Sequence, residues 1–242
     1  MTEQLKTIEV CFSPALFHLY KNEDSIVVIV DILRATSAIC SAFDKGAEKI
    51  IPVASIEEAK EYKKNGYLVA AERDGIVLDF ADFGNSPNNF TSDRVKGKTI
   101  VYSTTNGTYA VQIASSCEKV VIGSYLNHKV LTDWLLQQNK NIIILCAGWK
   151  NRFSLEDTIF TGALADALIK SKHFTTNCDS ALASIDLWNI AKNNLLGYIE
   201  KAAHRTRLRN LKLDDILEYC HTFDLSDSIP VLKDNYLYNI NC

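Results

Sequence analysis

Short, continuous runs of mostly β-branched apolar residues recur along the 242-residue chain and constrain its fold more than any other feature. A strand with one wet face alternates apolar and polar residues, whereas a strand covered on both faces is apolar throughout. The runs therefore predict strands of a mostly parallel, buried sheet. They are SIVVIVDI at 25–32, KIIPV at 49–53, YLVAA at 67–71, TIVY at 99–102, KVVI at 119–122 and NIIILC at 141–146.

Stretches with a helical pattern follow most of these runs. One of them opens with Ser55-Ile-Glu-Glu58, which is a capping-box pattern. Alternation of strands and helices predicts an α/β fold, a three-layer α/β/α architecture with right-handed crossovers. The predicted helices span residues 34–45, 55–65, 105–115, 127–139 and 154–171.

The last third of the chain changes character and predicts a helical C-terminal part. We expect one or two long helices over 179–211 and a short helix over 213–220, packed on the sheet. Residues 232–242 fit either an ordered strand or a frayed end. No linker or repeat is visible, so we expect residues 1–242 to form a single domain, with a subdivision near 175–180 as the alternative.

Composition excludes several classes of protein. The net charge of −3 supplies no basic excess for a nucleic-acid backbone, and no apolar run approaches the roughly 18 residues of a membrane span. The N-terminus lacks the pattern of a signal peptide. Seven cysteines without a CxxC pair argue against a disulfide framework or zinc ribbon. We therefore expect a cytoplasmic protein that binds neither nucleic acid nor membrane, and homo-oligomerisation stays open.

Polar residues gather just after the predicted strands, where open α/β sheets bind ligands. The segment STTNGT joins a strand to a helix, and its Asn-Gly pair tolerates positive φ, so backbone N–H groups can converge on an anion. The alternative is an ordinary turn with hydroxyl capping. The candidate phosphate or sulfonate ligands are Ser103, Thr104, Thr105, Asn106, Gly107 and Thr108.

Two acidic residues follow strands and are candidates for a metal. Asp31 is costly to bury without a partner, so it either holds a divalent cation, attacks phosphorus, caps the next helix or pairs with Arg34. Hard oxygen ligands suit Mg²⁺, and Mg²⁺ suits phosphate chemistry. Glu72 is a second candidate ligand, and the adjacent Arg73 either clamps an anion or forms a surface ion pair with it.

Further candidates lie in helices and loops. Glu156 and Asp157 open a predicted helix, where they either favour the helix dipole or serve as a metal ligand or general base. Asn85 lies in a turn-rich loop and is expected to position substrate together with Asn106 of the STTNGT turn. His204 and Arg207 lie on a basic helix that is either solvated or binds a polyanion.

Common nucleotide and hydrolase motifs are absent. The chain has no GxGxxG, GxxxxGK[ST], GxSxG or HExxH pattern. The DxDx[TV] signature of aspartyl phosphatases is also missing, because Leu33 stands where the second Asp would be. These absences disfavour dinucleotide binding, P-loop chemistry and an esterase elbow.

An ordered set of motifs across nearly the whole chain resembles the 2-phosphosulfolactate phosphatase family. Each motif is weak alone, but their order is specific. Ala71, Asp74 and Lys212 depart from the family by standing where Gly is common. The motifs are VDILRATS at 30–37, AERDG at 71–75, DFGNSP at 82–87, KTIVYSTTNGT at 98–108, CAG at 146–148, FSLED at 153–157, AHRTRL at 203–208, DILEYC at 215–220 and IPV at 229–231.

The resemblance implies a Mg²⁺-dependent acid phosphatase that converts 2-phosphosulfolactate to 3-sulfolactate and phosphate, a step towards coenzyme M in methanogens. Its small anionic phosphorylated substrate requires cationic sites and a metal between substrate and carboxylates. The alternatives are a phosphatase of another small phosphorylated hydroxy acid and a non-catalytic sensor of sulfonates or organic anions. The expected catalytic residues are Asp31, Arg34, Glu72, Asn85, Asn106 and Asp157; the expected metal ligands are Asp31 first, then Glu72, Glu156 or Asp157; and the expected substrate ligands are Arg34, Arg73, residues 103–108, His204 and Arg207.

Overall fold

A large mixed sheet dominates the computed structural model, which describes residues 5–211 and 213–241. The strand order is β5-β4-β6-β3-β11-β10-β7-β2-β8-β1-β9, with eleven strands in this part of the chain. The six predicted strands are confirmed as β2, β3, β4, β6, β7 and β8. The strands are β1 (Lys6–Cys11), β2 (Ile26–Val30), β3 (Lys49–Pro52), β4 (Leu68–Arg73), β5 (Ile76–Val77), β6 (Thr99–Ser103), β7 (Lys119–Gly123), β8 (Ile142–Cys146), β9 (Phe174–Thr175), β10 (Pro230–Lys233) and β11 (Tyr236–Asn239).

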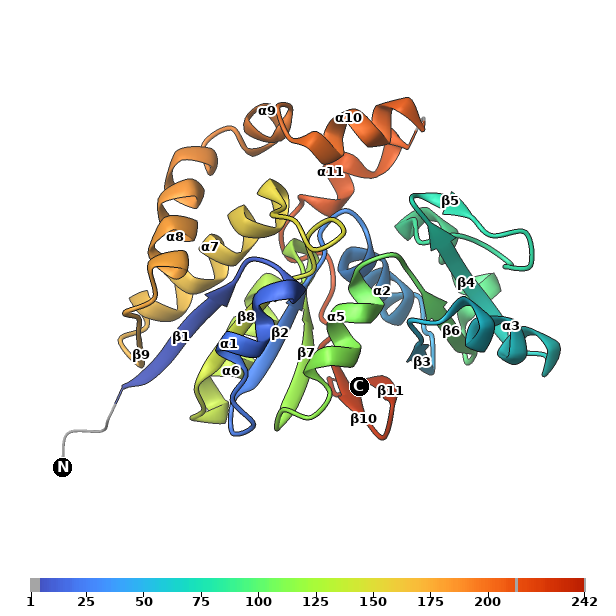
Figure 1. Ribbon diagram of the computed structural model, residues 1–242, viewed down its shortest axis with the longest axis horizontal. Helices are drawn as coiled ribbons and strands as arrows, with labels where there is room; N and C mark the ends of the chain where they lie inside the picture. The colour runs from blue at the N-terminus through green and yellow to red at the C-terminus, as the bar shows by residue number, and fades with distance from the viewer. Residues whose placement is uncertain (1–4, 212, 242) are drawn as a thin grey trace.

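Helices cover both faces of the sheet, which confirms the three-layer α/β/α fold (Figure 1). The five predicted helices between strands are confirmed as α2, α3, α5, α6 and α7. The helices are α1 (Phe17–Tyr20), α2 (Ala35–Asp44), α3 (Ile56–Lys64), α4 (Ser92–Val95), α5 (Gly107–Ala114), α6 (His128–Gln138), α7 (Leu155–Lys170), α8 (Asp179–Ala191), α9 (Leu195–Ile199), α10 (Ala203–Asn210) and α11 (Leu217–Cys220), with short 3₁₀ turns at 14–16, 87–89, 125–127 and 214–216.

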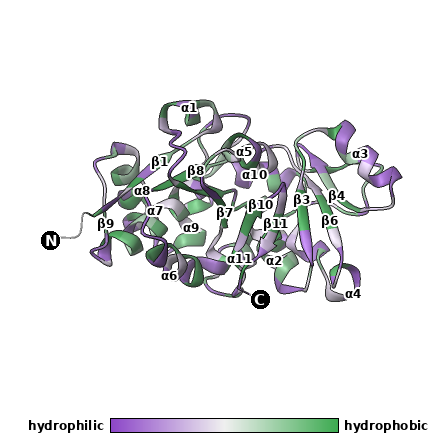
Figure 2. Ribbon diagram, turned by 90° about the horizontal axis from the view of Figure 1, so that it is seen from below, coloured by the Kyte–Doolittle hydropathy of each residue, from purple (hydrophilic) through white to green (hydrophobic). Residues whose placement is uncertain are grey.

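Strand β2 explains why the sheet needs cover on both sides. Its residues are all buried, and they face alternate cores. Val27 and Ile29 belong to the core that α2 and α5 complete, whereas Val28 and Val30 belong to the core of α6 and α7. Figure 2 shows hydrophobic colour along central strands and hydrophilic colour on the peripheral α3. A continuous apolar run in the sequence therefore indicates a strand that is buried on both faces.

An antiparallel hairpin lies in the middle of the otherwise mostly parallel sheet. Strands β10 and β11 pair with each other, and they also pair with β7 through Val231 and with β3 through Leu237. Of the two interpretations of residues 232–242, the structure favours the ordered strand for the described residues, 232–241. The hairpin joins two groups of strands whose ladders are mainly parallel, β4-β6-β3 on one side and β7-β2-β8-β1-β9 on the other.

The last third is more broken than the sequence predicts, because residues 179–211 form three helices rather than one or two. The Asn194 side chain accepts a hydrogen bond from Gly197 N at 3.2 Å and so begins α9 as an N-cap. Helices α7 and α8 pack closely at Gly162, where an added Cβ would lie 1.9 Å from the Ser184 carbonyl oxygen. The helical part shares its core with α7 through Ile199 and Leu208.

The cysteines of the described residues carry no disulfide, and five of these six are buried. Cys146 lies at the end of β8, where burial raises the pKa of its thiol. This environment is typical of an inert core thiol. None of the helices in the described ranges has both the length and the apolarity that a membrane crossing requires.

Candidate active site

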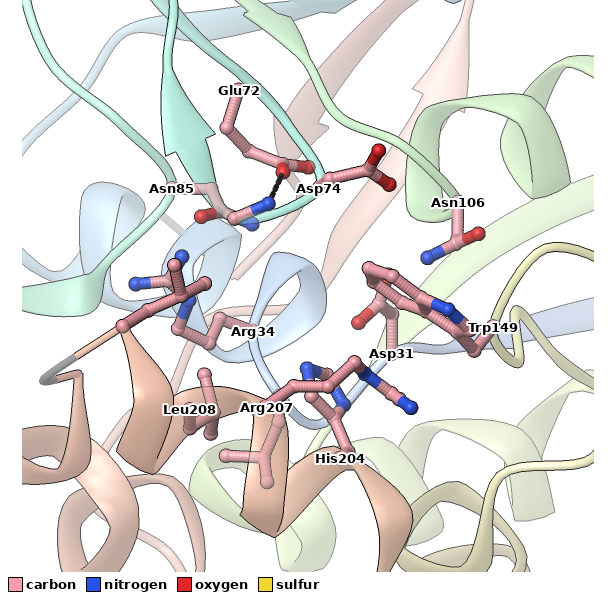
Figure 3. Close-up of a pocket in the computed structure, with 13 residues that line it drawn as sticks. Asp31, Arg34, Glu72, Asp74, Asn85, Asn106, Trp149, His204, Arg207 and Leu208 are labelled. Atoms are coloured by element: carbon pink, nitrogen blue, oxygen red, sulfur yellow. Dashed lines mark hydrogen bonds between the residues drawn. The ribbon is translucent and has the colours of Figure 1, made fainter.

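A pocket lies where β2, β4 and β6 end and where α10 approaches the sheet (Figure 3). Side chains from β4 and its turn line one side, side chains of α10 line the other, and Asp31 lies between them. The position agrees with the expectation that ligands bind beyond the carboxyl ends of parallel strands. The lining residues are Asp31, Leu33, Arg34, Glu72, Asp74, Gly75, Asn85, Asn106, Trp149, His204, Arg207, Leu208 and Leu211.

Asp31 follows β2 and keeps acceptor capacity for a ligand. Its Oδ1 accepts one long hydrogen bond, 3.4 Å from Ala35 N, and the residue is 8% exposed. Gly107 lets the N-terminus of α5 approach, since an added Cβ would lie 2.9 Å from Asp31 Oδ2. Burial raises the pKa of Asp31 to about 6, although the nearby charge of His204 opposes the rise.

Glu72, near the end of β4, is held more firmly. Its Oε1 accepts hydrogen bonds from Thr105 N at 2.7 Å and from Thr105 Oγ1 at 3.1 Å. Its Oε2 accepts a hydrogen bond from Gly75 N at 2.6 Å, and the residue is 4% exposed. The carboxylate therefore ties the turn after β4 to the loop after β6, and it lines the pocket.

Asp157, in the first turn of α7, accepts hydrogen bonds from the backbone of two loops. Its Oδ1 accepts a hydrogen bond from Ile32 N at 2.9 Å, and its Oδ2 accepts one from Gly148 N at 3.2 Å. Burial raises the pKa of Asp157 well above its usual range, and the neighbouring Glu156 and Asp31 add to the rise. Asp157 does not line the pocket. It links the segments that follow β2 and β8.

Glu156 is bound to His204 across the fold. Glu156 Oε1 and His204 Nδ1 lie 2.6 Å apart, and Glu156 is 2% exposed. Burial would raise the pKa of Glu156, but the hydrogen bond and the charge of His204 outweigh it and lower the pKa. The pair joins the first turn of α7 to α10. Glu156 Oε1 thus contacts the imidazole, and His204 lines the pocket. Metal binding by Glu156 or Asp157 stays a prediction.

Cationic and amide groups line the rest of the pocket. The Arg207 guanidinium lies 4.2 Å from the centre of the Trp149 ring, and burial lowers its pKa. Among the described residues, Arg207 Nε and Asn85 Oδ1 are buried polar atoms without a hydrogen-bond partner. A buried group without a partner is costly, so both atoms suit a polar ligand. Arg34 also lines the pocket and is buried.

Of the remaining predicted site residues, the structure places one in the lining of the pocket and the others outside it. Asn106 lines the pocket and accepts a hydrogen bond from Lys150 N at 2.9 Å. Arg73 points elsewhere, because it donates to Ala54 O at 2.8 Å, to Ser103 Oγ at 3.0 Å and to Glu72 O at 2.6 Å. Ser103, Thr104, Thr105, Gly107 and Thr108 are outside the lining. Anion binding by Arg73 and by these five residues stays a prediction.

Comparison with known proteins identifies the family to which the chain belongs. The model of the family described as 2-phosphosulpholactate phosphatase matches residues 11–235, which is most of the chain. The chain belongs to the 2-phosphosulfolactate phosphatase family. Enzymes of this family are phosphoric monoester hydrolases, which fits a pocket that combines carboxylates with cationic side chains.

Relatives cover most of the chain. A protein of Carboxydothermus hydrogenoformans is 38% identical over 225 residues, 92% of each chain. One from Caldanaerobacter subterraneus subsp. tengcongensis is 37% identical over 211 residues, 86% of this chain and 87% of its own. One from Clostridium botulinum is 34% identical over 213 residues, 86% of this chain and 89% of its own. All three are named probable 2-phosphosulfolactate phosphatase.

The phosphatase family suggests a metal, and the pocket offers a donor set for one. No three His, Cys, Asp or Glu side chains of the described residues form a ready-made metal site. Asp31 and Glu72 both line the pocket, however, and Asp31 has unfilled acceptor positions. Mg²⁺ is commonly held by one or two carboxylates, with waters and substrate phosphate completing its shell. Two carboxylates therefore fit a metal that binds together with the substrate.

Sequence reasoning missed the apolar and aromatic lining of this phosphatase pocket. Trp149 follows β8 within Ala147-Gly-Trp149, so its place after a strand was a usable signal. Leu208 and Leu211 lie on or directly after α10, and no local pattern separates them from core leucines. Asp74 lines the pocket and pairs with Lys150 at 2.7 Å.

Proposed function

We propose that the chain is a Mg²⁺-dependent phosphatase that hydrolyses 2-phosphosulfolactate to 3-sulfolactate and inorganic phosphate. The observation that carries the proposal is the pocket itself, in which Asp31 and Glu72 face His204 and Arg207 at the strand ends of a chain of this family. We further propose that it acts in the cytoplasm on a small anionic substrate, in the step towards coenzyme M or an equivalent use of sulfolactate.

Asp31 and Glu72 are the proposed holders of the metal. Bound there, Mg²⁺ would neutralise phosphoryl oxygens as negative charge develops on them. Glu72 keeps its orientation through Thr105 and Gly75, so it presents a fixed carboxylate to the site. Glu156 and Asp157 support the site from outside in this proposal, because neither carboxylate lines the pocket.

The cationic residues are the proposed substrate clamp. 2-Phosphosulfolactate carries a phosphate, a sulfonate and a carboxylate, so it needs more than one positive partner. Arg34 and Arg207 line the pocket, and Arg207 Nε lacks a partner. A guanidinium can grip an anionic group with two parallel hydrogen bonds. Asn85 and Asn106 are proposed to orient the substrate from the sheet side.

The oxygen that attacks phosphorus is either water or an Asp31 oxygen. In the first route, the Asp31 carboxylate is the proposed acceptor of the proton that the attacking water loses. Direct attack by Asp31 would instead form an acyl phosphate. A single turnover in ¹⁸O-water tests the first route, because water that attacks phosphorus directly places ¹⁸O in the released phosphate alone. Isotope found in the Asp31 carboxylate would therefore refute direct attack by water.

The decisive experiment measures phosphate release from 2-phosphosulfolactate with Mg²⁺ and with EDTA. We expect release by the wild type only with Mg²⁺, and almost none from Asp31→Asn. Asp133→Asn, an exposed α6 variant, is the matched control and should behave like the wild type. Release that persists in EDTA would refute the metal. No release from folded protein that still binds sulfolactate would favour a sensor, and release from other phosphorylated hydroxy acids alone would change the substrate.

A further inference from the structure

The Glu156–His204 pair has a geometry that the metal and the substrate clamp do not explain. His204 Nδ1 is directed at Glu156, 2.6 Å away, while the imidazole lines the pocket beside Trp149. Among the described residues, His204 Nε2 has no hydrogen-bond partner. The ring is therefore anchored at one nitrogen, and its other nitrogen is left for a ligand.

We propose that His204 is the general acid that protonates the leaving oxygen of the substrate, and that Glu156 is its positioning residue. The inference rests on the phosphatase function proposed above. Glu156 accepts the hydrogen bond from Nδ1, which fixes the ring and leaves Nε2 to carry the transferable proton. His204 thereby acquires a chemical role in place of the simple anion contact that its basic helix suggests.

The chemistry of the leaving group requires such a donor. Cleavage of a phosphorylated hydroxy acid breaks the bond between phosphorus and the ester oxygen, and the electron pair goes to that oxygen. His204 Nε2 gives its proton to this oxygen as the bond breaks, so the product leaves as an alcohol. The attacking oxygen forms the new bond to phosphorus. When it belongs to water, its proton passes to Asp31, and solvent exchange then restores both groups. When it belongs to Asp31, water hydrolyses the resulting acyl phosphate, which releases inorganic phosphate and restores the carboxylate.

Other groups of the described pocket are less suited to this step. The guanidinium groups of Arg34 and Arg207 do not release protons near neutral pH. Asp31 and Glu72 are assigned to the metal and the attacking oxygen. Asp74 is half-exposed and pairs with Lys150 at 2.7 Å. His204, on the helix side of the pocket, remains as the donor.

The position of His204 is fixed from more than one direction. The centres of its ring and the Trp149 ring are 5.6 Å apart, and Arg207, one turn further along α10, stacks on the same indole. Glu156 lies in the first turn of α7, where the helix dipole favours a carboxylate. A proton donor has to be held within hydrogen-bond reach of its target, and these contacts supply that restraint.

The test compares leaving groups in His204→Gln, which keeps a polar side chain but cannot deliver a proton. On 2-phosphosulfolactate, whose leaving oxygen is strongly basic, we expect kcat to fall roughly 10²–10⁴-fold with KM little changed. On 4-nitrophenyl phosphate, whose leaving group needs no protonation, the loss should be about tenfold or less. Equal losses on both substrates, or a loss confined to KM, would mean that His204 only binds.

A second measurement uses the natural reaction alone. The kinetic isotope effect of ¹⁸O at the bridging oxygen of 2-phosphosulfolactate should increase in His204→Gln, because an unprotonated oxygen departs with more bond cleavage. An unchanged isotope effect would overturn the inference even if the enzyme rejects aryl phosphates. Inactive wild-type enzyme would instead mean that the proposed function has failed.

Glu156→Gln tests the positioning role. It keeps the side-chain volume and removes the charge, so we expect a kcat loss smaller than that of His204→Gln, again with KM little changed. The ¹⁵N resonances of His204 should report a changed tautomer balance in this variant. His173→Gln, at an exposed turn, is the matched control and should alter neither readout. Unchanged resonances in Glu156→Gln would contradict the assignment.

Discussion

The two sides of the pocket are built in different ways. One group of lining residues, here called the sheet wall, consists of Asp31, Glu72 and Asn106, which lie at or shortly after strand ends. The other, the helix wall, consists of His204 and Arg207 on α10. Several backbone N–H groups bind the carboxylates of the sheet wall. In the helix wall, one hydrogen bond to Glu156 and two ring contacts with Trp149 hold His204 and Arg207.

This difference separates two tasks. The sheet wall is acidic and is fixed by the same hydrogen bonds that close its loops, so it suits a metal ion with strict geometry. The helix wall is basic and is carried by α10, a helix of eight residues. Leu211, directly after α10, reaches the opposite side at Gly75, where an added Cβ would lie 2.6 Å from Leu211 Cδ1. In the proposed function, a phosphorylated anion would lie between them, where a metal would shield it from the carboxylates and the cations would attract it directly.

The largest expected effect comes from taking the metal away from the sheet wall. Chelation with EDTA should lower phosphate release by roughly 10³-fold, because the carboxylates then repel the phosphate that they otherwise bind through the cation. Release is measured before and after addition of excess Mg²⁺, which should restore it. Equal rates with and without EDTA would mean that the sheet wall works without a metal.

Removing the Arg207 cation from the helix wall should have a smaller effect. Arg207→Leu keeps an apolar contact with Trp149 but loses the charged hydrogen bonds, which are worth about 1.5–3 kcal/mol. We therefore expect kcat/KM to fall by roughly 10–100-fold, mainly through KM. Steady-state kinetics check this. Arg209→Leu, on the same helix and paired with Glu200, serves as the control and should change kcat/KM little.

The buried carboxylate of Asp31 should lower the free energy of unfolding, and Asp31→Asn tests this expectation. Burial raises the pKa of Asp31 from 3.8 to about 6, so the folded state keeps a proton that the unfolded state loses. The stabilisation linked to this proton is complete below about pH 4, and it is lost as the pH rises towards 6 and beyond. In EDTA at pH 7.5 we expect Asp31→Asn to be more stable than the wild type by about 2–3 kcal/mol.

Urea unfolding at pH 4 and at pH 7.5 measures this difference. The stability gain of Asp31→Asn should be small at the lower pH and full at the higher one. A gain that is the same at both values would show that the burial of charge at Asp31 is not its source.

The smallest expected effect on catalysis belongs to Arg73, which sequence reasoning assigned to the anion. In the structure Arg73 bonds three acceptors that brace the sheet wall from behind. Arg73→Met should therefore lower stability by about 1–3 kcal/mol while KM changes by about threefold or less. Thermal unfolding and kinetics are measured together. A large increase in KM with unchanged stability would instead show that Arg73 binds the substrate.

Much of the fold could be predicted because each buried parallel strand appears in the sequence as a continuous run of apolar residues. Strand β1 was not predicted because several of its residues are not buried, so its run of apolar residues is interrupted. The β10–β11 hairpin escaped because its short strands are half-exposed and their pairing partners lie far away in sequence. Local pattern carries no information about such distant pairing.

The site divides in the same way. Asp31 and Glu72 could be proposed from sequence because each lies at or next to a strand end, where topology alone brings polar groups together. The pairing of Glu156 with His204 could not, since it depends on how α10 packs over α7. The direction of Arg73 is likewise decided by the carbonyl of Ala54 on a neighbouring segment. Sequence places a residue at an edge, but packing decides which way its side chain points.

The central hairpin has a consequence for biosynthesis. Asp31 follows a strand on one side of β10–β11, and Glu72 lies on a strand on the other side. A ribosome makes residues 230–239 after every other strand of the described sheet, so the backbone ladder between the two groups of strands closes only when this segment has left the exit tunnel. The two groups of strands that carry Asp31 and Glu72 are therefore joined last, through a hairpin that contributes none of the residues lining the pocket.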